Sequence, residues 1–265
     1  MHEDSVKAQA ARGGERARRA HDWPADDLPP EACTLDLRRR VLAMVPYFAG
    51  LNEDDLSTVH AAFRAVPMAA GASVVDAGAP AERLFVLASG RVKLVTATPA
   101  GAEHVVDVLG PGDAFGALPL LGAPANDVAA VALTSGCLLV TSAEQFASLV
   151  TGLPRVALAV LADVSDRLQD AHARLRRASG APVDARLAAA LLTLSARLGE
   201  PEADGRTLGA PLSQEDLAAL AGSTLETVNR ILSRWRKRGW VRTGRRRVVL
   251  RDVAALEAVA RGDES

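Results

Sequence analysis

The segment 212–252 constrains the fold more than any other part of the chain, because its capping and turn residues define two short helices. An S-x-x-D cap begins the first helix at Ser213, and Gly222 permits a sharp turn after it. An S-x-x-E cap at Ser223 then begins the second helix. Two short helices joined by a glycine turn predict a helix-turn-helix.

The second helix of this motif is amphipathic. Spacing of i, i+3, i+4 and i+7 predicts one buried face, made of Val228, Ile231, Leu232 and Trp235. In the major groove an arginine can donate two hydrogen bonds to guanine, and a carboxylate can accept one from cytosine. The predicted base-reading residues on the opposite face are therefore Glu226, Asn229 and Arg230. The competing interpretation is a surface ion pair between Glu226 and Arg230, four residues apart on the helix.

Positive charge is concentrated around the same motif. From Ser223 to Arg251 there are ten Lys or Arg residues and one acid, Glu226. Such clustering favours binding to phosphates. A basic hairpin with its turn at Thr243-Gly244 follows the second helix. The predicted phosphate-contacting residues are Ser213, Thr224, Thr227, Arg234, Lys237, Arg245, Arg246 and Arg247.

Short β-prone runs separated by glycines extend from Val66 to Val140. Several short strands with frequent turns predict a sandwich or barrel. The glycines fall where the runs break, at positions that need positive φ or close backbone approach. They are Gly78, Gly90, Gly101, Gly110, Gly112 and Gly116.

A long helical pattern begins after Pro154 and ends at Gly180. Apolar residues with alternating three- and four-residue spacing form a seam typical of helices that pack in a coiled coil. The predicted dimer interface is Leu161, Val164, Leu168, Ala171 and Leu175. The alternative is a single helix packed on its own β-domain.

These patterns predict an α+β protein with an N-terminal β-roll (jelly roll), a long dimerisation helix and a C-terminal winged helix-turn-helix. The expected divisions are a disordered tail at 1–34, a β-roll sensor domain with flanking helices at 35–150, the dimerisation helix at 151–180 and the DNA-binding domain at 181–265. A length of 265 residues with 49% hydrophobic content supports two cores.

Several functional classes are disfavoured. The five histidines are isolated and no nucleophile signature appears, so we expect neither an enzyme nor a metal site. No long apolar run or signal-peptide pattern is present, which predicts a cytoplasmic protein without membrane contact. Cys33 and Cys137 lie far apart in sequence and are expected to be reduced thiols.

From about residue 40 onward the chain resembles the CRP/FNR superfamily. The resemblance rests on the segment Glu226-Thr227-Val228-Asn229-Arg230, which matches the family's recognition-helix signature, and on glycines that match the β-roll turns. It implies a cyclic-nucleotide-binding-like β-roll and a homodimer that binds a two-fold symmetric DNA site. RNA polymerase is a further partner to consider.

The chain departs from the cyclic-AMP-responsive branch of this family. Ala117 stands where that branch has a ribose-binding carboxylate, and Asp127 stands where it has a phosphate-binding arginine. A carboxylate repels a phosphodiester, so no cyclic AMP response is expected. The candidate effector-pocket residues are Gly116, Ala117, Leu118, Asp127, Val128 and His172.

No cofactor is predicted, although haem and cyclic di-GMP remain open. Haem would need an axial ligand such as His104 or His172, and one N-terminal cysteine, Cys33, cannot hold an iron–sulfur cluster.

In the recognition helix, Leu225 replaces an additional guanine-reading arginine of the CRP branch, and the base-reading trio is similar to the FNR pattern. We therefore expect a transcription regulator that recognises TTGA-like half-sites. The alternative function is a ligand-binding module that regulates a protein partner.

Overall fold

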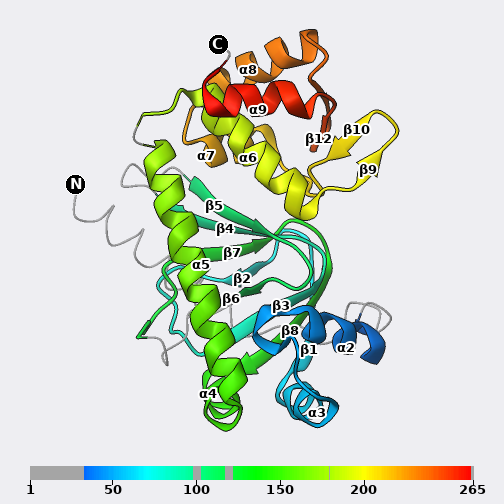
Figure 1. Ribbon diagram of the computed structural model, residues 1–265, viewed down its shortest axis with the longest axis vertical. Coiled ribbons are helices and arrows are strands. Elements are labelled where there is room, and N and C mark those ends of the chain that lie inside the picture. Colours follow the sequence, from blue (N-terminus) through cyan, green and yellow to red (C-terminus); the bar gives the residue numbers. More distant parts are fainter. Residues whose placement is uncertain (1–32, 98–102, 117–121, 179, 264–265) are drawn as a thin grey trace, which may run out of the picture. The chain divides into compact units, whose positions relative to one another are not determined.

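The computed structural model describes residues 33–97, 103–116, 122–178 and 180–263 (Figure 1). The described residues divide into two compact units, one drawn from 33–94 and 111–157 and the other from 95–110 and 158–263. Residues 1–32 of the predicted 1–34 tail, and the predicted positions Gly101, Ala117 and Leu118, lie outside the described residues. The last two residues of that predicted tail are ordered, which corrects its boundary: Cys33 is in a disulfide, and Thr34 caps the first described helix.

The β-rich region forms two four-stranded sheets, ordered β1-β8-β3-β6 and β2-β7-β4-β5 (Figure 1). In the first sheet β8 pairs antiparallel with both β1 and β3. The predicted β-roll is therefore confirmed. The strands are β1 (Arg64–Met68), β2 (Ser73–Val75), β3 (Arg83–Ser89), β4 (Val92–Ala97), β5 (Glu103–Leu109), β6 (Ala114–Phe115), β7 (Ala129–Ala132) and β8 (Gly136–Ser142).

The centre of the first sheet is buried on both faces. Strands β3 and β8 each contain five consecutive buried residues, so their sequences read as continuous apolar runs and not as an alternation. Phe85 of β3 stacks on Phe115 of β6 with 5.2 Å between ring centroids. Gly116 follows at φ 106°, and a Cβ atom there would lie 2.6 Å from the Arg83 carbonyl oxygen. Glycine at 116 is thus required by backbone approach as well as by the turn.

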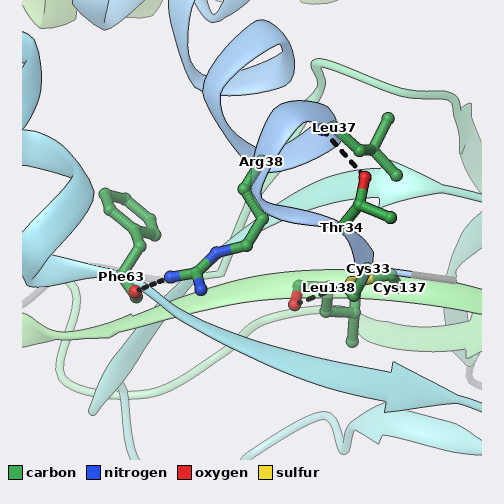
Figure 2. Close-up of a disulfide and its surroundings, with 7 residues drawn as sticks. All are labelled: Cys33, Thr34, Leu37, Arg38, Phe63, Cys137 and Leu138. Atoms are coloured by element: carbon green, nitrogen blue, oxygen red, sulfur yellow. Dashed lines mark hydrogen bonds between the residues drawn. A yellow bond between two sulfur atoms is a disulfide. The ribbon is translucent and has the colours of Figure 1, made fainter. Parts of the chain in front are cut away.

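Short helices flank the sheets: α2 (Leu35–Met44), the 3-10 turn η2 (Pro46–Phe48), α3 (Glu53–Ala62) and α4 (Ala143–Gly152). Side-chain caps begin three of them, since Thr34, Asn52 and Ser142 each accept a hydrogen bond from a backbone N–H in the first turn. The cap of α2 is visible in Figure 2. Tyr47, Phe48 and Phe146 are buried beneath these helices and pack ring against ring.

The two cysteines form a disulfide, which corrects the prediction of reduced thiols. Figure 2 shows Cys33, two residues before the start of α2, bonded to Cys137 of β8. Their Cα atoms are 5.9 Å apart, a normal disulfide separation. The prediction was wrong because the cysteines are 104 residues apart in sequence, and that separation carries no information about how the segment before α2 lies against the inner strand β8.

The predicted long helix is α5 (Pro154–Ala178). Its described side chains include four large apolar ones that are 43–68% exposed, namely Leu158, Leu161, Val164 and Leu168. The side chains of Ala171 and Leu175 lie outside the described part. Among the described residues no single helix is long and apolar enough to cross a membrane; α4 and the start of α5 reach that length only as two helices bent by 113°.

The C-terminal part contains α6 (Val183–Leu198), α7 (Gln214–Ala221), α8 (Leu225–Lys237) and α9 (Val253–Arg261). A four-stranded sheet, ordered β11-β12-β10-β9, accompanies them. Its strands are β9 (Pro201–Glu202), β10 (Gly205–Thr207), β11 (Val241–Gly244) and β12 (Arg247–Leu250). The predicted hairpin exists, but its turn is at Arg245-Arg246 and not at Thr243-Gly244. Arg246, in this turn, adopts a left-handed φ of 52°.

Candidate nucleic-acid interface

Helix α7 and the turn after it have the geometry expected of the first half of a helix-turn-helix. Ser213 and Asp216 form a reciprocal capping box, with the Asp216 N–H donating to Ser213 Oγ at 3.0 Å. Gly222 ends α7 in the left-handed conformation at φ 58°, and the Ser223 N–H closes back onto the Ala218 carbonyl at 3.0 Å. The turn between the helices is therefore fixed by backbone hydrogen bonds.

The cap of α8 lies one residue later than predicted. Thr224 is the N-cap, and its Oγ1 accepts from the Thr227 N–H at 3.3 Å, so the predicted cap at Ser223 is wrong. The shift has a local cause: Ser223 is still part of the turn that closes α7. The predicted buried face is confirmed, because Val228, Ile231, Leu232 and Trp235 are all buried.

The three predicted base-reading residues differ in exposure. Glu226 and Arg230 are exposed on α8, and no ion pair joins them within the described part of the chain. The competing interpretation of a surface ion pair is therefore not what the structure contains. Asn229 is half-buried, and its Oδ1 is buried without a hydrogen-bond partner among the described residues. The two charged side chains are therefore available to a ligand, whereas the Oδ1 atom of Asn229 is shielded from solvent.

The three predicted hydroxyl contacts already make hydrogen bonds within the protein. Ser213 Oγ donates to Asp216 Oδ2 at 2.8 Å, and the hydroxyls of Thr224 and Thr227 bond to each other at 3.0 Å. In this structure these hydroxyl groups stabilise the N-terminal ends of α7 and α8. A phosphate contact from any of them remains a prediction.

The structure divides the basic residues into paired and unpaired groups. On the sheet, Arg242 and Arg251 bind Asp204, while Arg242 and Arg247 bind Glu202. The hydrogen bond from Arg242 lowers the pKa of the Asp204 carboxyl and raises the pKa of the guanidinium. Arg247 is thus engaged, although it was predicted to contact phosphate.

On α8, Arg234 donates to Asp184 Oδ2 at 2.9 Å. The remaining predicted cations are exposed and have no ion-pair partner among the residues that the structure places: Arg230, Lys237, Arg245 and Arg246. Two of these lie on α8 and two at the tip of the β11–β12 hairpin. This is the arrangement of a helix that enters a groove with a wing beside it.

An open hollow of about 460 Å³ lies along α8 and the first turn of α6. Thr227, Arg230 and Arg234 line it from α8, and Val183 and Asp184 from α6. Two guanidinium groups and a hydroxyl suit an oxyanion, whereas the carboxylate opposes one. The hollow is therefore part of the candidate nucleic-acid surface, and the Asp184 carboxylate offsets part of its positive charge.

Sequence reasoning missed the role of α6 in this surface. Arg186 donates to the carbonyl oxygens of Ala221 and Gly222 at the helix-turn-helix turn, at 2.9 and 3.1 Å. A third bond, 2.8 Å long, reaches the Ala181 carbonyl between α5 and α6. An arginine that satisfies three backbone carbonyls shows no charge pattern, so nothing in the sequence spacing pointed to it.

The candidate effector-pocket residues that are described differ in burial and in the part of the chain that holds them. Gly116 is tightly placed against β3, Asp127 is exposed and Val128 is half-buried. Asn126, beside Asp127, is buried and donates its amide to the Ala79 and Pro80 carbonyls. His172 is exposed on α5, in the other compact unit. The pocket assignment remains a prediction.

Comparisons with known proteins agree with this architecture. Residues 65–152 match the family model described as a cyclic nucleotide-binding domain, and residues 185–259 match the Crp-like helix-turn-helix domain. The structure of FixK2 from Bradyrhizobium japonicum shares the fold, with a TM-score of 0.67 and 23% identity over 74% of this chain and 96% of that one.

Two relatives align over most of their length. A CRP-like cAMP-activated global transcriptional regulator of Mycobacterium tuberculosis is 28% identical over 83% of this chain and 99% of its own. The Cyclic AMP receptor protein of Thermus thermophilus is 34% identical over 82% of this chain and 97% of its own. With both domain models matched in order and this degree of identity, the chain belongs to the CRP/FNR superfamily of DNA-binding transcription regulators.

Proposed function

We propose that this regulator binds DNA as a homodimer on a two-fold symmetric site with TTGA-like half-sites, and that cyclic AMP is not its effector. The observation that carries the proposal is the state of Glu226 and Arg230. Both are exposed on the capped recognition helix α8, and neither is neutralised by the other within the described residues. An unpaired arginine and carboxylate on one helix face can read a guanine and a cytosine.

The expected half-site follows from the residues around this pair. Leu225, an exposed apolar side chain, occupies the position of the additional guanine-reading arginine in the CRP branch, so one guanine contact should be absent. Selection from a randomised duplex library tests this expectation. Enrichment of inverted TTGA repeats supports the proposal, and enrichment of TGTGA repeats or of no motif contradicts it.

The dimer proposal rests on the apolar face of α5. Leu158, Leu161, Val164 and Leu168 are large, exposed and spaced to share one side of the helix. Apolar surface of this kind is stabilised by burial, and the 3,4 spacing suits a second copy of the same helix. Two copies would present two α8 helices to half-sites separated by about one turn of DNA.

The effector proposal rests on Asp127. Its exposed carboxylate stands where a cyclic-AMP-binding relative needs a cation, and a cyclic phosphodiester would be repelled by it. The two relatives above carry cyclic AMP in their names. Calorimetric titration should give no binding heat with cyclic AMP at millimolar concentration, and saturable binding would refute this part of the proposal. The same titration with cyclic di-GMP, and an absorption spectrum after haem addition, examines the two effectors left open.

The alternative function is regulation of a protein partner. The salt dependence of the affinity for duplex DNA distinguishes it from DNA binding. Counterion release makes DNA affinity fall steeply with ionic strength, in proportion to the phosphates contacted. Affinity for duplex DNA that does not depend on salt would favour the alternative. A contact with RNA polymerase is a separate proposal, tested by transcription from a promoter that carries the selected site.

A further inference from the structure

The first turn of α6 places a carboxylate against the recognition helix. Asp184 Oδ2 accepts a hydrogen bond from Arg234 of α8 at 2.9 Å, and both residues line the hollow that also contains Arg230. The Asp184 side chain is 18% exposed and the Arg234 side chain 43% exposed. The carboxylate is therefore sheltered, while part of the guanidinium remains within reach of a ligand.

Arg234 is placed to meet the DNA backbone. It follows Arg230 by four residues, so it lies on the same face of α8 about one turn nearer the C-terminus. Recognition helices contact base edges with their N-terminal residues, and a side chain one turn later lies nearer the rim of the groove, where the phosphates are. A phosphate and the Asp184 carboxylate would then compete for one guanidinium.

Asp184 is held firmly enough to act as that competitor. Its other oxygen, Oδ1, accepts the Ala185 N–H at 3.0 Å within the first turn of α6. Arg186, two residues after Asp184, donates hydrogen bonds to backbone carbonyl oxygens in the turn between α7 and α8. Asp184 therefore has a fixed position relative to the recognition helix.

We propose that Asp184 neutralises Arg234 and thereby limits the phosphate affinity of the recognition helix. The inference rests on the proposed function, DNA binding through α8. An arginine already paired with a carboxylate adds no net charge to the interface, and so contributes little to counterion release on binding. An arginine released from that pair contributes one phosphate contact.

The test is the substitution Asp184→Asn, measured by fluorescence anisotropy of the full chain on its palindromic duplex across a salt series. Asparagine keeps an oxygen for the Ala185 N–H but removes the charge. The expected result is several-fold tighter binding at low salt, with a plot of log affinity against log salt that is steeper by about 0.9 for each subunit bound. Asp184→Glu retains the charge and should restore the wild-type slope.

Two further variants test whether the change in affinity and salt slope comes specifically from the Asp184–Arg234 pair. Asp263→Asn removes the same charge from an exposed ion pair with Arg261, and should leave the slope unchanged. Arg234→Gln, added to Asp184→Asn, should abolish the gain. Thermal unfolding of each variant confirms that it is folded.

Weaker or unchanged binding by a folded Asp184→Asn protein overturns the inference, because the carboxylate would then orient Arg234 for DNA or have no effect. Failure of the wild-type protein to bind any duplex would instead contradict the proposed function.

Discussion

At the scale of single residues, the role of each cation is set by its neighbours and not by its charge. The sequence shows ten basic residues from 223 to 251 beside one acid. In the structure, acids outside that segment neutralise four of them, since Asp184, Glu202 and Asp204 pair with Arg234, Arg242, Arg247 and Arg251. What remains for DNA is a smaller set on α8 and the hairpin tip.

Arg230 is the member of that set with a predicted base contact. Replacement of Arg230 by alanine should cost about 1–3 kcal/mol of binding free energy at the guanine that it reads. The loss should disappear on a duplex in which that guanine is already replaced, because no contact is then left to remove. Anisotropy on both duplexes measures it. An Arg230→Ala protein that binds the best site unchanged would refute the assignment.

Gly222 is required by conformation alone. Its φ of 58° is left-handed, and a Cβ atom there would meet nothing within 4 Å. Gly222→Ala should therefore lower the free energy of unfolding by about 1–2 kcal/mol, the cost of holding an L residue in this region. Gly152→Ala is the matched control, since Gly152 ends α4 without a positive φ and also has open space around it. Chemical denaturation measures the free energy of unfolding of both variants. Equal stability of Gly222→Ala and Gly152→Ala would contradict the conformational argument.

At the scale of elements, long periodic or continuous apolar patterns were sufficient for prediction, and short ones were not. Helix α5 and the buried face of α8 follow from the spacing of their apolar residues, and β3 and β8 follow from continuous apolar runs. Strands β9 and β10 have two and three residues, too few to show an alternation. The hairpin turn was misplaced because Arg246 adopts the conformation that glycine usually supplies.

In the candidate site too, some residues could be predicted from sequence spacing and others could not. Glu226, Asn229 and Arg230 could be predicted because they share one helix with a known periodicity. Asp184 could not, because its partner Arg234 lies 50 residues away and the contact depends on how α6 packs against α8. The disulfide was missed for the same reason.

The disulfide should contribute measurably to stability. In the chain-entropy account, a cross-link that closes a loop of about 100 residues stabilises the folded state by about 4–5 kcal/mol. Reduction should therefore lower the urea midpoint of the protein, and Cys33→Ser should lower it to the same value without further response to reductant. Thiol alkylation before and after reduction establishes that the bond is present. A midpoint insensitive to both changes would contradict its structural role.

The apolar face of α5 carries the dimer prediction. Leu161→Glu with Leu168→Glu should convert the dimer to monomer, because facing carboxylates cannot be buried unpaired. Met44→Glu is the control, since Met44 is 66% exposed on α2 and not on α5. Sedimentation velocity gives the mass of each form. A double variant that still sediments as a dimer would place the interface elsewhere.

At the scale of the whole molecule, the net charge gives no indication of DNA binding. With 31 basic and 32 acidic residues the formal charge is −1, so attraction to DNA cannot come from the molecule as a whole. It must come from the local surface of α8 and the β11–β12 hairpin, where Arg230, Lys237, Arg245 and Arg246 have no ion-pair partner among the described residues. Pairing two such surfaces through α5 would double the contacts with phosphate and lengthen the sequence that is read.

The central claim is sequence-specific binding of a TTGA-like palindrome by the recognition helix. Its most direct test is fluorescence anisotropy of the effector-free protein on a TTGA palindrome, a TGTGA palindrome and a scrambled duplex over a salt series. The account predicts the tightest binding to the TTGA palindrome, with affinity that falls steeply as salt rises. Equal affinity for all three duplexes, or preference for TGTGA, would contradict it.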